Sequence, residues 1–168
     1  MDLSCIQLDG SHTLAKRGGE AVAYQGRKAA KTTNLLFLAD NQGQRLACAS
    51  PQEGKHNDLH QIKELFEELC QILIKAGIDR KGLFLNADAG FDSQEFREIC
   101  EQKDIHTNIP TNPRNTNKMN DQTIKYQYFD EELYARRVVI EHANAWMDSF
   151  KALLIRFEKK LLIGWLLL

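Results

Sequence analysis

Two aspartates stand where a protein can hold a divalent metal ion. Asp9 and Asp88 each end a short apolar stretch, and each is closely followed by a glycine. In open α/β sheets, ligands gather at the carboxyl ends of the strands, where a rigid element holds an acidic side chain toward solvent. An aspartate before a glycine is also a common turn or cap residue, so that alternative stays open for each aspartate alone.

A third carboxylate, Glu141, lies in a stretch with helical periodicity. On a helical wheel of about 100° per residue, Glu141 shares a polar stripe with Tyr134 and Arg137, on the side away from the apolar residues. Such a stripe can face a ligand. It can equally be a solvated helix surface with an Arg137–Glu141 ion pair, worth only a few tenths of a kcal/mol.

The hydrophobic pattern predicts the elements that would carry these side chains. Alternating or continuous apolar runs predict strands, and apolar residues recurring at three and four positions predict helices. Three antiparallel strands followed by alternating helices and strands indicate an α/β domain with a mixed sheet. The predicted strands cover 5–9, 35–39, 45–49, 83–88 and 105–109, and the predicted helices cover 57–76, 92–102 and 132–159.

The segments between these elements have patterns of their own. Residues 11–33 contain three glycines and many charges, which favours a long loop or an exposed hairpin. Asp92, followed by Glu95 three positions later, resembles a capping box at the start of a helix. Residues 111–128 are polar and aperiodic, which predicts a loop.

The composition is that of one globular domain of 168 residues with a formal net charge of −1. Most DNA-binding proteins are basic, so the total charge counts against nucleic acid. The charge is uneven, however, with five basic residues against one acidic residue in 13–31 and a basic excess in 136–160. Such clusters can bind phosphate locally, or they can be a solvated mixed-charge surface.

Four scattered cysteines contain no Cys-x-x-Cys pair, which argues against a zinc site and favours reduced core cysteines in a cytosolic protein. No signal peptide is visible. The apolar run 161–168 is too short to span a bilayer, so we expect no membrane partner. We expect this run to be a truncated tail that packs only partly.

Three blocks of the chain resemble those of insertion-sequence DDE transposases, in the same order. Residues 8–13, Leu-Asp-Gly-Ser-His-Thr, resemble the first catalytic strand of this family, and residues 86–93 resemble its second block. The spacing of Tyr134, Arg137 and Glu141 is similar to the third block, Tyr-x2-Arg-x3-Glu-x6-Lys. Asp148 departs from the pattern, because the family has lysine there.

The resemblance implies a ribonuclease H-like α/β fold, with a mixed five-stranded sheet and flanking helices. It implies that Asp9, Asp88 and Glu141 are the catalytic and metal-binding triad for two Mg²⁺ or Mn²⁺ ions, with Asp9 bridging both. Two ions about 3.5–4 Å apart can activate an attacking oxygen and stabilise a leaving one. The implied reaction is metal-dependent DNA cleavage at the element's ends, followed by strand transfer into target DNA.

The same resemblance implies DNA as the partner, both transposon ends and target, bound by a dimer or a higher oligomer in the bacterial cytoplasm at the nucleoid. The side chains that we expect to contact DNA are basic, aromatic or imidazole groups near the predicted site: Tyr134, Arg137, Lys151, Lys28, Lys31 and His12.

The expected organisation is a catalytic domain over 1–160, which includes a polar loop at 111–130, and an apolar tail over 161–168 in a chain truncated at one or both ends. Three alternatives remain at this point. The chain can be an inactive transposase remnant with residual DNA binding, a ribonuclease H-like nuclease, or a plain α/β interaction domain.

Overall fold

A computed structural model of the chain describes residues 1–116, 128–148, 155–157 and 159–160. The predicted tail at 161–168, Lys151 and most of the predicted polar loop at 111–130 lie outside the described residues.

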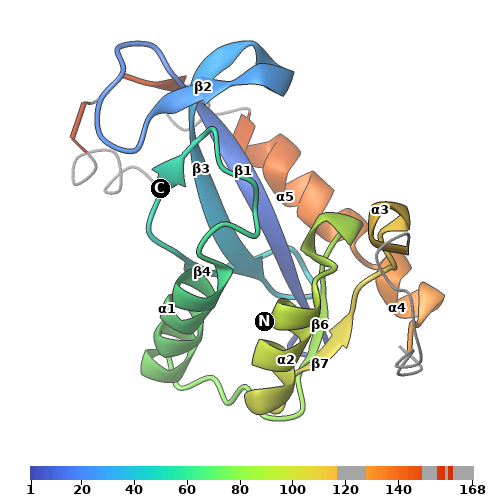
Figure 1. Ribbon diagram of the computed structural model, residues 1–168. Coiled ribbons are helices and arrows are strands. Elements are labelled where there is room, and N and C mark those ends of the chain that lie inside the picture. The colour runs from blue at the N-terminus through green and yellow to red at the C-terminus, as the bar shows by residue number, and fades with distance from the viewer. Residues whose placement is uncertain (117–127, 149–154, 158, 161–168) are drawn as a thin grey trace.

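A mixed sheet runs through the centre of the molecule in the order β2-β3-β1-β6-β7 (Figure 1). Strand β1 pairs antiparallel with β3 and parallel with β6, and β6 pairs parallel with β7. The five predicted strands are all present, as β1 (Ile6–Ala15), β3 (Ala30–Ala39), β4 (Arg45–Cys48), β6 (Phe84–Asn86) and β7 (His106–Asn108). Three short strands add to them: β2 (Ala23–Gln25), β5 (Gln52–Glu53) and β8 (Ile155–Arg156).

The main hydrophobic core lies on one face of this sheet. Successive side chains of a strand point to opposite faces, so Ile6 and Leu8 share a face with Leu36 and Leu38. Helices α1 (Ile62–Lys75) and α2 (Gln94–Gln102) cover this face with their apolar stripes (Figure 1).

Residues from the C-terminal part of the chain cover the opposite face of the sheet. Helix α5 (Val138–Asp148) packs there, and Ile140 forms a small second core with Phe37 and Ala39. The remaining short helices among the described residues are η1 (Gly26–Lys28), η2 (Ala89–Phe91), α3 (Pro113–Thr116) and α4 (Glu131–Ala135).

The prediction of a long loop or exposed hairpin at 11–33 was wrong at its ends, because β1 continues to Ala15 and β3 already begins at Ala30. Residues 11–14 pair in register with 32–35, so polar and charged residues extend both strands beyond their apolar parts. Backbone pairing carries these extensions, and a search for apolar runs misses them.

The single helix predicted over 132–159 was also wrong. It is interrupted at Arg136 and Arg137, where the chain tightens to hydrogen bonds between residues three apart. Further on, Ile155 and Arg156 pair in parallel with the end of β1 as β8. The buried Arg156 guanidinium donates to the Glu20 carbonyl and to the Thr33 hydroxyl, contacts that no helical periodicity predicts.

Helix α2 begins one residue later than the predicted capping box places it. The Ser93 hydroxyl accepts from the Phe96 amide as the N-cap, whereas the Asp92 side chain is buried in an ion pair. Cys5, Cys70 and Cys100 are buried, as predicted for core cysteines. None of the helices in the described ranges combines the length and the hydrophobicity that crossing a bilayer requires.

Candidate active site

Parallel pairing of β1 with β6 places the two predicted aspartates side by side, although Asp9 lies within β1 and only Asp88 follows a strand end. The register pairs Gln7 with Asn86, and Asp9 and Asp88 each follow two residues later. The negative charge of Asp88 accordingly contributes to the raised pKa of Asp9. The strands therefore assemble two carboxylates that are 79 residues apart in sequence.

Asp9 is held by two side chains that approach it from the α5 face. Arg137 donates from Nη2 to Oδ1 of Asp9 at 2.9 Å, and Asn144 donates from Nδ2 to Oδ2 at 2.9 Å. Arg137 also donates from Nη1 to the Leu8 carbonyl at 2.9 Å, so its guanidinium spans the strand backbone and the carboxylate. The Asp9 carboxylate is consequently fixed on both oxygens.

Burial is the largest influence on the ionisation of Asp9. Its side chain is only 14% exposed, and this desolvation raises the pKa of Asp9 above its ordinary value. The Arg137 charge and hydrogen bond act in the opposite direction. A divalent cation beside Asp9 would offset the same desolvation, because an opposite charge favours the ionised form.

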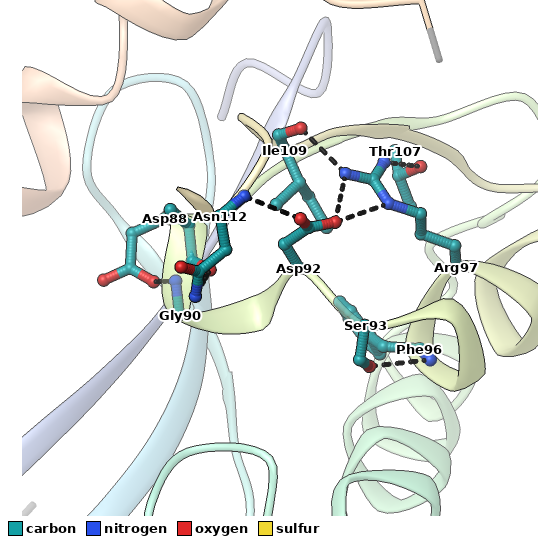
Figure 2. Close-up of polar contacts among 10 residues, drawn as sticks. Asp88, Gly90, Asp92, Ser93, Phe96, Arg97, Thr107, Ile109 and Asn112 are labelled. Atoms are coloured by element: carbon teal, nitrogen blue, oxygen red, sulfur yellow. Dashed lines mark hydrogen bonds and ion pairs between the residues drawn. The ribbon is translucent and has the colours of Figure 1, made fainter. Parts of the chain in front are cut away.

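Asp88 occupies the turn that leaves β6. Its Oδ1 accepts from the Gly90 amide at 2.7 Å, so the carboxylate caps the short helix η2 (Figure 2). The turn residue and the candidate ligand are thus the same aspartate, and the two interpretations of the Asp-x-Gly sequence do not exclude each other. Asp88 is half-buried, which leaves part of its carboxylate accessible.

A buried ion pair fixes the loop that carries Asp88. Asp92 pairs with Arg97 at 2.8 Å and accepts from the Asn112 amide at 2.7 Å, as Figure 2 shows. Arg97 also donates to the Ile109 carbonyl, and the Asn112 side chain donates to the Ala89 carbonyl. This network ties the segment after β7 to the loop after β6, so Asp88 projects from a rigid turn.

Two buried asparagines dock the segment before α5 against the ends of β6 and β7. Asn108 donates to the Asn86 side chain and to the Asp130 carbonyl, each at 2.9 Å. Asn86 in turn donates to the Leu133 carbonyl at 2.8 Å. This docking places Tyr134 and Arg137 beside the strand ends.

Of the residues in the third block, Arg137 and Tyr134 lie with the aspartates. Burial raises the pKa of Tyr134 most strongly, and Arg137, Asp88 and Asp9 all influence it. Glu141 is exposed on the first turn of α5. In the part of the chain that the structure describes, no three His, Cys, Asp or Glu side chains are grouped to hold a metal ion, so Glu141 does not join the two aspartates in such a group here.

The remaining candidate DNA contacts lie on β1, in η1 and on β3, or outside the described ranges. Lys28 donates to the His12 carbonyl at 3.4 Å, and His12 contacts the Thr32 hydroxyl at 3.3 Å. Burial lowers the pKa of His12. Lys31 is exposed on β3, whereas Lys151 lies outside the described residues.

Sequence reasoning missed Asn144, although it contacts Asp9 directly. In the single helix predicted over 132–159, Asn144 follows Arg137 by seven residues, about two turns, which places both residues on one side of that helix. That spacing was the available signal. A neutral amide does not stand out among charged residues in a sequence.

The side chains around Asp9 fit a hard divalent cation. Asp9 and Asp88 supply carboxylate oxygens, the ligand type that Mg²⁺ prefers. The Asp9 carboxylate accepts from Arg137 on Oδ1 and from Asn144 on Oδ2, and Gly10 also hydrogen-bonds to it. Because a carboxylate offers about four acceptor sites, it retains capacity for a cation. Next to it, the buried Oδ1 of Asn144 has no hydrogen-bond partner among the described residues, as expected where a donor such as a bound water is to be received.

Comparison with known proteins shows the family and the fold of the chain. A family model described as Transposase DDE domain matches residues 1–163. A chain of the piggyBac transposase synaptic complex with hairpin DNA superposes with a TM-score of 0.57 at 10% identity, covering 99% of this chain and 44% of that one. A chain of the simian T-cell lymphotropic virus intasome in complex with PP2A regulatory subunit B56 gamma gives 0.50 at 14% identity, covering 89% and 40%.

These likenesses confirm the predicted ribonuclease H-like fold. The chain spans less than half the length of either solved chain. No curated protein sequence matches it.

Proposed function

The chain belongs to the transposase DDE domain family, and from that premise we propose that it is the catalytic domain of an insertion-sequence transposase. Its proposed reaction is cleavage of DNA strands at the ends of the element and transfer of those ends into target DNA. The observation that carries this proposal is the β1–β6 pairing, which brings Asp9 and Asp88 close together beside Arg137.

Asp9, Asp88 and Glu141 are the proposed metal ligands. The position of Glu141 on α5 supports its inclusion. Within the helix it lies about 60° around the axis from Asn144, which contacts Asp9. An exposed glutamate with three rotatable side-chain bonds can turn from that position toward the aspartates. When bound, two Mg²⁺ or Mn²⁺ ions would activate the attacking oxygen and stabilise the leaving one.

The residues of the chain position the reactants. Arg137 keeps Asp9 oriented and supplies positive charge beside a scissile phosphate. Tyr134 lies close enough to Asp9 and Asp88 for their charges to influence its pKa. His12, Lys28 and Lys31 extend the proposed DNA path along β1 and β3, with Lys151 as a further contact. We propose that a dimer or a higher oligomer binds the two transposon ends.

Metal-dependent nicking of a supercoiled plasmid that carries the DNA flanking the gene tests this function. We expect nicking with Mg²⁺ or Mn²⁺, and at least a 100-fold loss in Asp9→Asn, Asp88→Asn and Glu141→Gln, because each removes a ligand charge. Glu64→Gln is the matched control, since Glu64 is an exposed carboxylate in the first turn of α1. We expect this control to nick as the unmodified chain does.

The outcomes separate the alternatives. Nicking that ignores the flanking DNA sequence would indicate a ribonuclease H-like nuclease. A folded chain that binds the DNA without nicking it would indicate an inactive remnant. Full activity in Glu141→Gln would remove Glu141 from the site and leave the two aspartates.

A further inference from the structure

Asn144 makes a contact that its position in the family pattern does not explain. Its Nδ2 donates to Oδ2 of Asp9, the oxygen that Arg137 does not use. Because an ionised carboxylate only accepts hydrogen bonds, the amide must present its nitrogen to Asp9. Its Oδ1 then points elsewhere, and in the described residues this buried atom has no partner.

We propose that Asn144 is a positioning residue for the metal-binding carboxylate, holding Asp9 through Nδ2 and receiving a metal-bound water at Oδ1. The inference rests on the proposed function, since it requires that Asp9 be a metal ligand. A buried acceptor without a donor lowers the stability of the fold. Such an acceptor beside a candidate metal ligand favours a donor that arrives with the metal ion. Mg²⁺ keeps several of its waters when bound, and each water is such a donor.

Two residues of neighbouring segments serve one carboxylate. Arg137 lies at the break before α5 and Asn144 lies within α5, seven residues later, and both side chains reach Asp9. Each takes one oxygen of Asp9. Arg137 places a positive charge beside Asp9, whereas Asn144 orients the carboxylate through a hydrogen bond from a neutral amide. An aspartate in the place of Asn144 would repel Asp9 when no cation is present.

The chain contains a matched asparagine whose carboxylate partner is Asp2 instead of Asp9. Asn41, in the turn between β3 and β4, donates from Nδ2 to Oδ2 of Asp2 at 3.0 Å, and its Oδ1 is also buried without a partner among the described residues. Asn41 donates to Ser4 as well. Replacing Asn41 thus removes the same kind of contact from a turn that carries no candidate ligand.

The test measures Mn²⁺ binding to the full chain in two ways. One is the loss of the electron paramagnetic resonance signal of the free ion, and the other is the dependence of the melting temperature on the metal. We expect Asn144→Ala to weaken Mn²⁺ binding about 10-fold or more, as removal of residues that orient metal ligands does. Asn41→Ala should lower the melting temperature without metal and leave the Mn²⁺ affinity unchanged. This split separates positioning from a purely structural role.

Asn144→Asp keeps the side-chain volume and provides a second variant should Asn144→Ala not fold. It places a carboxylate against Asp9, so we expect a lower melting temperature without metal and a larger gain on adding Mn²⁺. Unchanged Mn²⁺ affinity in Asn144→Ala, or an unchanged metal response in Asn144→Asp, overturns the inference. Mn²⁺ binding that Asp9→Asn leaves intact, or a chain that binds no Mn²⁺, overturns the proposed metal site and this inference with it.

Discussion

The two faces of the sheet differ in what their side chains do. Toward α1 and α2, β1 presents Ile6 and Leu8, which enter a continuous apolar core. Toward α5, the same strand presents Gln7 and Asp9, and the apolar cluster there is small. Figure 1 shows the strands between these two layers of helices.

The difference places the main apolar core on one face and the proposed metal site on the other. Adjacent residues of one strand serve both, because the side chains alternate with a period of two. A shift of one residue in register would move Asp9 into the apolar core, so the core on the α1–α2 face fixes the face on which Asp9 stands. The core therefore holds the Asp9 carboxylate at a buried position, although burial raises the pKa of Asp9.

The largest effect on stability is expected from a cavity on the α1–α2 face. Phe66 of α1 is fully buried and packs edge-to-face on Phe96 of α2, with ring centroids 5.1 Å apart. Phe66→Ala should lower the free energy of unfolding by about 3–5 kcal/mol, measured by urea denaturation. A loss below about 1 kcal/mol would mean that this face does not carry the stability of the domain.

A cavity on the α5 face should cost less stability and more function. Ile140 is fully buried, and among the described residues it packs in a small apolar cluster with Phe37 and Ala39. Ile140→Ala should cost about 2 kcal/mol, the low end for such truncations, because a small cluster can relax around the gap. The same variant should weaken Mn²⁺ binding, since Ile140 seats the helix that carries Asn144. A cost equal to that of Phe66→Ala would erase the contrast between the faces.

The face that is easier to predict from the sequence is the stable one. The apolar period at 57–76 and the short apolar runs at 45–49, 83–88 and 105–109 placed α1, β4, β6 and β7 within a few residues, because burial imposes periodicity. The α5 side was mispredicted where polar contacts override periodicity. The guanidinium of Arg137 reaches Asp9 at the break between α4 and α5, and the guanidinium of Arg156 supports β8.

The same division applies to the candidate site. The placement of Asp88 just after a strand end could be predicted from its local sequence. The same prediction was wrong for Asp9, because β1 continues past it to Ala15. Asn144 and the Asp92–Arg97 pair could not be predicted, since their roles arise from contacts between separate elements. Asp92 was expected to cap a helix, and only the folded chain brings Arg97 and Asn112 to it.

The smallest effect should come from the charged surface of the stable face. Lys103, just after α2, forms an ion pair with Glu67 of α1, and the hydrogen bond from Lys103 lowers the pKa of Glu67 below its ordinary value of 4.5. Glu67 is 46% exposed, so solvent screens the pair, and Lys103→Met should cost less than about 1 kcal/mol at pH 7.

A carboxyl group whose pKa is lowered on folding stabilises the protein above its unfolded-state pKa, and this contribution disappears as the pH falls through the folded value. The loss in free energy of unfolding caused by Lys103→Met should therefore shrink as the pH falls below about 4.5. Lys63→Met, which removes an exposed lysine of α1, should show no such trend. Urea denaturation between pH 3 and pH 7 measures both. A deficit that is constant with pH would mean that the lysine stem, which is largely buried, stabilises the junction of α1 and α2 by packing. In that case apolar contact would stabilise the α1–α2 face even at its edge. Charge would then contribute to the properties of the face that carries Asp9 and not to the stability of the α1–α2 face.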